Sequence, residues 1–253
     1  RWCTTISPAW MTTTSVAALT TAQIKGLNST AFGLLNSTQV TALTTAQVAV
    51  LSSTHIDALS TTEVAVLSTT QIGALSVSQL LTFDSTQVSA LTTTELASLT
   101  TNQIQGINTL GVAALTTTQF STLNSSQIGA FTIAQVGAIN STDVRALSTT
   151  EISVLTAFQI KALSTSSVRA LDTTQLSSFS TTQFAALTTT QFNALSTTNI
   201  VVLDTTEISS LRSSQIAALG SGIVSVLTTT QISALTSTQA QGLTTTEVHA
   251  LSG

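Results

Sequence analysis

The chain has 253 residues, of which only 6% are charged, with six Lys or Arg against ten Asp or Glu and a net charge of −4. This balance offers no basic surface for nucleic acid or an anionic membrane. A hydrophobic content of 42% argues against disorder, but the longest aliphatic run is four residues, Ile200–Leu203, too short to cross a bilayer. We therefore expect no nucleic-acid partner and no membrane insertion.

Residues 1–10, RWCTTISPAW, are irregular and contain both tryptophans, the only proline and the only cysteine. We expect an N-terminal cap over the segment that follows, or a junction with a preceding segment. A single cysteine excludes an internal disulfide framework and offers no paired metal ligand. Cys3 either forms an intermolecular disulfide in an oxidising setting or is buried.

From Met11 onward the sequence follows an unbroken eight-residue period, L-T-T-T-Q-I-x-A. Every eighth residue from Met11 to Leu251 is Leu or another large apolar residue. A second apolar series follows five residues behind the first, from Val16 to Val248, with one small member, Ala240. Such self-similarity predicts a repeat domain over residues 11–253.

The polar positions of the repeat predict a short helix in each unit. The residue after each Leu is Ser, Thr, Asn or Asp, the preferred helix N-caps, except at Arg212 and Gly220. Gln or Glu follows three residues later in 22 of the 30 units, which completes a capping box. Nine of the ten acidic residues fall at one of these two positions, where the helix dipole favours negative charge. The alternative, a β-solenoid, fits less well because strand alternation would place the two apolar series on opposite faces.

Helices of about six or seven residues are too short to be stable alone, so they must stack as a solenoid. Departures from Leu recur in one phase of 24 residues, which indicates the length of one turn. They are Met11, Phe83, Ile107, Phe131 and Phe179, with Ile139 as the exception. The predicted fold is an all-α solenoid of about ten turns, with one very short helix per repeat and three helices, or 24 residues, per turn.

A candidate assembly contact lies on the outward side of the predicted helices. The second helical position is normally Thr or Ser, but Leu110, Ala134 and Phe158 interrupt it at 24-residue spacing. Ile133 and Ala157 replace the preceding Thr in two of these units. Exposed apolar stripes usually mark contacts, unless the helices rotate and bury these residues.

No residues indicate catalysis, a cofactor or a metal site. His55 and His249 occupy different positions of the repeat, and every Asp except Asp57 has a predicted capping role, which argues against a Ser-His-Asp triad. No glycine-rich phosphate loop is present. We therefore predict that the chain is not an enzyme. Four N-glycosylation patterns begin at residues that are also predicted N-caps, Asn28, Asn36, Asn124 and Asn140.

The unit L-T-T-T-Q-[IV]-x-A resembles Thr/Gln-rich octapeptide tracts of very large secreted bacterial proteins described as adhesin-like, haemagglutinin-like or haem-utilisation-like. The resemblance covers residues 11–253 and implies an extracellular or cell-surface role. It transfers no functional residues and includes no motif for haem ligation. The chain stops within a unit at Leu251-Ser252-Gly253, so we expect a segment of a longer protein or end-to-end stacking.

Two functions remain open. The first is a structural protein that associates with itself, laterally or end to end, as the subunit or stalk of an extracellular filament, surface layer or adhesin. The alternative is a surface-binding module whose regular Thr rows recognise ice or a polysaccharide.

Overall fold

The computed structural model describes residues 11–251, which form thirty α-helices and contain no β-strand. They belong to two compact units, an N-terminal unit that ends at Phe131 and a C-terminal unit that begins at Thr132. The irregular segment 1–10, with Cys3, lies outside the described residues. Within residues 11–251, none of the helices combines the length and the apolar character needed to cross a bilayer.

The N-terminal unit contains α1 (Thr13–Ala17), α2 (Thr21–Gly26), α3 (Ser29–Phe32), α4 (Ser37–Thr41), α5 (Thr45–Val48), α6 (Ser53–Asp57), α7 (Thr61–Val64), α8 (Thr69–Gly73), α9 (Val77–Thr82), α10 (Ser85–Ala90), α11 (Thr93–Ser98), α12 (Thr101–Gln105), α13 (Thr109–Ala114), α14 (Thr117–Phe120) and α15 (Ser125–Gly129). The C-terminal unit contains α16 (Ile133–Ala138), α17 (Ser141–Ala146), α18 (Thr149–Ser153), α19 (Ala157–Ala162), α20 (Thr165–Ala170), α21 (Thr173–Leu176), α22 (Thr181–Ala186), α23 (Thr189–Phe192), α24 (Thr197–Val201), α25 (Thr205–Ser210), α26 (Ser213–Ile216), α27 (Ser221–Val224), α28 (Thr229–Ser233), α29 (Ser237–Ala240) and α30 (Thr245–Ala250).

Each helix begins directly after the residue that the sequence predicts as its N-cap. At the start of α8, Ser68 has an extended backbone (φ −75°, ψ 158°), and its hydroxyl accepts a hydrogen bond from the backbone N–H of Gln71 at 3.2 Å. In return, Oε1 of Gln71 accepts from the backbone N–H of Ser68 at 2.8 Å. Among the described helices, only those that follow Arg212 and Gly220 lack a side-chain cap, as the sequence predicts.

The helices are shorter than predicted, with four to six residues each, because the chain leaves the α-conformation before the next repeat begins. The end of α10 shows how. The N–H of Leu91 donates to the carbonyl of Val88 at 3.2 Å, three residues earlier rather than four, which tightens the last turn. Leu91 then turns to ψ 134° and leads directly into the next N-cap, Thr92.

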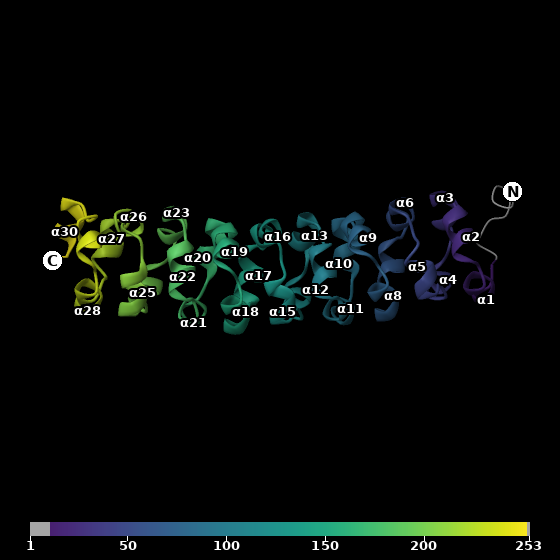
Figure 1. Ribbon diagram of the computed structural model, residues 1–253, viewed down its shortest axis with the longest axis horizontal. Helices are drawn as coiled ribbons and strands as arrows, with labels where there is room; N and C mark the ends of the chain where they lie inside the picture. The colour runs from purple at the N-terminus through teal and green to yellow at the C-terminus, as the bar shows by residue number, and fades with distance from the viewer. Residues whose placement is uncertain (1–10, 252–253) are drawn as a thin grey trace. The chain divides into compact units, whose positions relative to one another are not determined.

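Each turn of the solenoid contains three helices. Within each unit, a helix packs against the helix three places further along the chain, as α1 does with α4 and α16 does with α19. Figure 1 shows these short helices following one another around successive turns. Three helices of one repeat each correspond to 24 residues per turn, so the predicted fold and turn length are confirmed.

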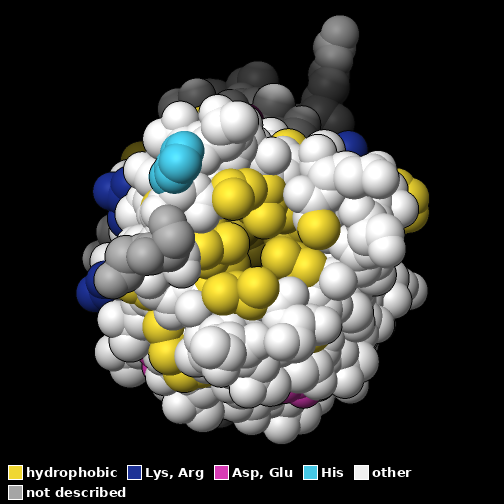
Figure 2. Space-filling model, turned by 90° about the vertical axis from the view of Figure 1, so that its left-hand side faces the viewer, with side chains coloured by type: hydrophobic (Ala, Val, Ile, Leu, Met, Phe, Trp, Pro, Cys, Tyr) yellow, Lys and Arg dark blue, Asp and Glu magenta, His cyan; other side chains and the backbone are white. Residues whose placement is uncertain are grey.

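Two apolar side chains per repeat fill the interior, as Ile72 and Leu75 do in the α8 repeat. Figure 2 views the C-terminal unit from its C-terminal end and shows apolar side chains in the middle with polar side chains and backbone around them. Val248 in α30 is 52% exposed, whereas Val224, one turn earlier, is completely buried. Burial of each turn therefore depends on the turn that stacks on it.

Candidate assembly surface

A buried side chain at the third helical position ties each turn to the previous one. While Oε1 of Gln71 caps its own helix, its Nε2 donates to the carbonyl oxygens of Val40 at 3.0 Å and Leu43 at 2.8 Å, at the end of α4. One amide therefore satisfies an N–H group at one helix start and two carbonyl groups one turn earlier. The same pair of carbonyls, 31 and 28 residues earlier, accepts from Gln47, Gln71, Gln79, Gln87, Gln103, Gln127, Gln175, Gln183, Gln191, Gln215, Gln231 and Gln239. We call this set the glutamine ladder.

Sequence reasoning identified the capping role of these residues but missed their second role. A signal was present, since Gln occupies the third helical position in 17 units and Glu in only five. Glu completes a capping box as well as Gln does. An ionised carboxylate, however, has no proton to donate to the carbonyls of the previous turn. The excess of Gln therefore reflects the contact between turns.

His55 replaces Gln in the ladder by using its two ring nitrogens in the same two ways. The backbone N–H of Ser52 donates to Nδ1 at 3.2 Å, so the ring proton lies on Nε2, which donates to the carbonyl of Leu27 at 2.7 Å. The ring also lies against Phe32, with centroids 4.9 Å apart. His55 is thus a structural residue that joins two turns. Across residues 11–251, no group of three His, Cys, Asp or Glu side chains is arranged to hold a metal ion.

Asn108 replaces the missing side chain where the third helical residue is Gly111. Its Oδ1 caps α13 by accepting from the N–H of Gly111 at 2.8 Å, and its Nδ2 donates to the carbonyl of Phe83 at 2.6 Å. This is the carbonyl that a Gln at position 111 would contact. A Cβ atom on Gly111 would lie 2.7 Å from Cγ2 of Val88 in α10. Removal of the side chain therefore lets these two helices pack unusually closely.

Two glutamates that occupy the third helical position in place of Gln have raised pKa values. Burial raises the pKa of Glu95, although the backbone N–H of Thr92, which donates to its Oε2 at 2.6 Å, acts in the opposite direction. Burial also raises the pKa of Glu207, to which the charge of Asp204 contributes. Both carboxylates occupy positions where a proton donor fits better than an anion.

Four of the five predicted contact residues lie on two adjacent helices of the C-terminal unit, where three of them are exposed and Ala157 is half-buried. Ile133 and Ala134 lie at the start of α16, and Ala157 and Phe158 occupy the equivalent positions of α19, which packs against α16. The side chains of Ile133 and Phe158 are 56% and 72% exposed. We call these four residues the α16–α19 patch.

The fifth candidate, Leu110 in α13, belongs to the N-terminal unit and is also largely exposed. The alternative in which these helices rotate and bury the large side chains is wrong for Leu110, Ile133 and Phe158. By contrast, Ile107 and Phe131, which replace Leu in the same sequence phase, are buried in the core.

The self-capped repeats, the stacking of every third helix and the glutamine ladder together define a solenoid protein built from octapeptide repeats. Comparison with known families matches the ALTTAQ repeat over residues 9–45, 42–77, 136–173 and 166–197. These stretches cover just over half of the sequence, and the chain belongs to the ALTTAQ repeat family. No curated protein matches the chain.

Proposed function

We propose that this solenoid is a structural, self-associating segment of an extracellular or cell-surface assembly, such as a filament, surface layer or adhesin stalk. The observation that carries the proposal is the exposure of Ile133 and Phe158 on two helices that pack against each other, in a chain whose outward helix positions are mostly Ser and Thr. Large exposed apolar groups on adjacent elements usually mark a contact with another molecule.

The chemistry of the α16–α19 patch favours a second copy of the chain as the partner. All four side chains are uncharged, so the patch can be placed against itself without burying a charge. Two copies related by a twofold axis would each present the same residues to the other, the arrangement most homodimers use. Lateral pairing of this kind leaves both ends of each solenoid outside the contact.

The repeat itself supplies variants that test the patch without disturbing the fold. Every first helical residue is Ser or Thr except Val77, Ile133 and Ala157, and Thr is common at the second helical position. The double variant I133T/F158T therefore restores the usual surface. V77T changes an exposed residue at the same repeat position in α9 and serves as the matched control.

Sedimentation velocity over a range of protein concentrations, with electron microscopy of the same samples, should show that the unaltered chain associates into oligomers or fibres. I133T/F158T should sediment as a monomer, and V77T should behave like the unaltered chain. An unaltered chain that stays monomeric throughout would overturn self-association. Association that persists in I133T/F158T would exclude the patch as the contact. Antibody labelling of intact cells tests the proposed location.

The surface-binding alternative stays a prediction. Thr side chains are exposed at the second helical position of many repeats. Thr62 and Thr94 are examples. A thermal-hysteresis assay separates ice recognition from a purely structural role, because a scaffold without affinity for ice would give no hysteresis.

A further inference from the structure

Two arginines lie one turn apart on the surface of the C-terminal unit. The repeat position after the second apolar series usually holds a small or uncharged residue, but it is Arg145 in α17 and Arg169 in α20. These two helices pack against each other, and both side chains are exposed. Four of the six Lys and Arg residues of the chain fall between positions 145 and 212, so cationic side chains concentrate in this unit.

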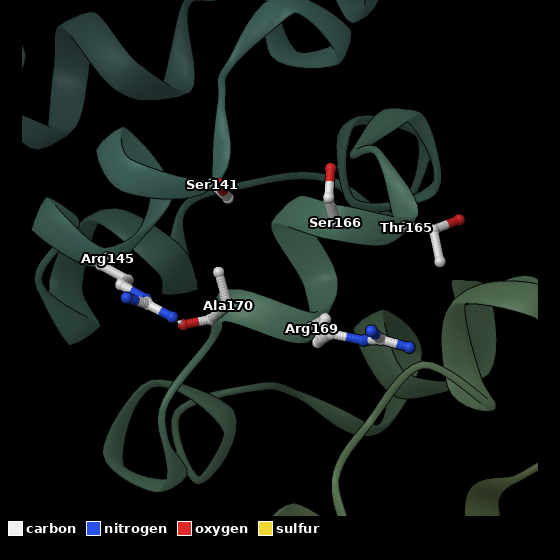
Figure 3. Close-up of a pocket in the computed structure, with 6 residues that line it drawn as sticks. All are labelled: Ser141, Arg145, Thr165, Ser166, Arg169 and Ala170. Atoms are coloured by element: carbon white, nitrogen blue, oxygen red, sulfur yellow. Dashed lines mark hydrogen bonds between the residues drawn. The ribbon is translucent and has the colours of Figure 1, made fainter.

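The two arginines line a hollow of about 450 Å³ whose other walls carry hydroxyl groups from Ser141, Thr165 and Ser166. The Nε of Arg145 donates to the carbonyl of Ala170 at 3.3 Å, which holds this side chain across the gap between the turns. In Figure 3 the two guanidinium groups lie on opposite sides of Ala170 and do not converge on one point.

The hollow continues along the surface. A second hollow shares Arg145, Arg169 and Ala170 and extends to the polar side chains of Ser196 and Thr198 at the start of α24. The two hollows together form a groove with hydroxyl groups at both ends and two cations in the middle. We call it the arginine groove.

Most N–H donors of the two guanidinium groups remain available to a ligand. Arg145 uses one donor for Ala170, and Arg169 has no hydrogen bond or ion pair in the part of the chain that the structure describes. Guanidinium groups bind carboxylates through paired, charge-assisted hydrogen bonds, whereas hydroxyl groups match the hydroxyls of sugars. Two guanidinium groups that point apart are better matched by anionic groups spaced along a polymeric ligand than by one small anion.

We propose that the arginine groove binds an acidic polysaccharide, with uronic-acid carboxylates on the two arginines and sugar hydroxyls on the flanking Ser and Thr side chains. The site uses α17, α20 and the start of α24, none of which contributes a residue to the α16–α19 patch. It is therefore independent of self-association, and either proposal can fail without the other.

Asp172 is the exposed acidic residue that lines the groove, and it opposes the binding of an anion. Its Oδ1 caps α21 by accepting from the N–H of Gln175 at 2.7 Å. Asn caps helices as well as Asp does, so D172N removes the charge and keeps the cap. The other nearby carboxylate, Asp143 in α17, is buried.

Isothermal titration of the full chain with oligogalacturonate, with neutral dextran and with inorganic sulfate tests the proposal. We expect oligogalacturonate to bind more tightly than sulfate, dextran not to bind, and added salt to weaken binding by screening. The R145A/R169A variant should lose about tenfold or more in affinity, because charge-assisted hydrogen bonds are lost. K161A, which removes an exposed cation outside the groove, should leave the affinity unchanged.

The D172N variant gives a second readout that loss of folding cannot imitate, because its affinity for oligogalacturonate should increase. Circular dichroism spectra that match the unaltered chain would establish that R145A/R169A is folded. Equal affinity in R145A/R169A and the unaltered chain, or binding of dextran as tight as that of oligogalacturonate, would overturn the proposal. Sulfate that binds as tightly as the polymer would overturn it too, because the groove would then be a small-anion site.

Discussion

Replacing Glu95 by Gln should stabilise the N-terminal unit at neutral pH. Glu95 is only 3% exposed and is the third helical residue of α11. Glutamines at this position of other repeats donate to two carbonyls of the previous turn. In Gln103, the next ladder residue, Nε2 donates to the carbonyls of Ile72 at 3.1 Å and Leu75 at 2.9 Å. The variant E95Q keeps the capping bond to Thr92 and adds the missing donor.

The expected gain follows from the number of hydrogen bonds restored. Two bonds at about 0.5–1.5 kcal/mol each give about 1–3 kcal/mol in the free energy of unfolding. For a chain of this length, each kcal/mol corresponds to a rise of about 2–4 °C in Tm. The reciprocal variant Q103E removes the same two bonds one repeat later and should lose a similar amount.

The stability gained by E95Q should be larger at neutral pH than at acidic pH, because Glu95 is buried. Burial raises the pKa of Glu95 above its ordinary value of 4.5, so the folded state binds the proton more tightly than the unfolded state. Protonated Glu95 is therefore stabilising below pH 4.5, and this stabilisation is lost as the pH rises through the raised pKa. Gln carries its donor at every pH, so the advantage of E95Q should shrink on acidification.

Urea unfolding of both proteins between neutral pH and pH 4 measures this difference. Subtracting the two curves isolates Glu95 from Glu207, whose pKa is also raised and which remains in both proteins. The reasoning would be refuted if E95Q and the unaltered chain had the same free energy of unfolding at neutral pH, or if their difference did not change with pH. Either result would mean that a proton donor at position 95 does not stabilise the contact with the previous turn.

The remaining predictions concern packing and capping in the same unit. G111A should cost about 1–3 kcal/mol in thermal unfolding, because its Cβ would lie 2.7 Å from Val88, whereas G73A, with no atom within 4 Å of the added Cβ, should be neutral or stabilising by up to about 1 kcal/mol; equal effects would contradict the tight packing of α13. Q71A should cost about 1–3 kcal/mol in urea unfolding because it removes the two hydrogen bonds from Nε2 to the previous turn, more than the roughly 1 kcal/mol expected for S68A, which removes only the cap. A larger loss in S68A would show that the contact between turns is minor.

The sequence predicts the fold well because the same pattern of capping and apolar residues recurs from repeat to repeat. Cap residues, capping boxes and two apolar series each point to one short helix, and substitutions such as Phe83 and Phe131 indicate the length of a turn. The sequence predicts the C-terminal ends of the helices less accurately than their starts. The tight bond at residues such as Leu91 arises from the need to begin a new cap at once, which helix propensity does not describe.

Contacts between turns were harder to predict, because they join residues 28 and 31 positions apart and do not show in a single repeat. The excess of Gln over Glu is visible in the sequence. Its cause is apparent only once the structure shows that carbonyls of the previous turn lie within reach of the Gln amide. The replacement of Gln by Asn108 beside Gly111 depends on the close approach of two helices. Outward exposure of Phe158 follows from helical periodicity, but the arginine groove does not. It depends on the packing of α17 against α20, which brings Arg145 and Arg169, 24 residues apart, to one surface.

The glutamine ladder has a consequence for how such a gene can lengthen. All three sides of a turn use the same amide-to-carbonyl contact, as Gln71, Gln79 and Gln87 do in consecutive repeats. Duplication of a single octapeptide would therefore preserve every cap and continue both apolar series. It would also shift all downstream surface residues to the next of the three helix positions in a turn. One extra repeat between Arg145 and Arg169 would leave the helices intact but separate the two guanidinium groups onto different faces. A surface site that spans two turns is therefore preserved only when repeats are added in multiples of three.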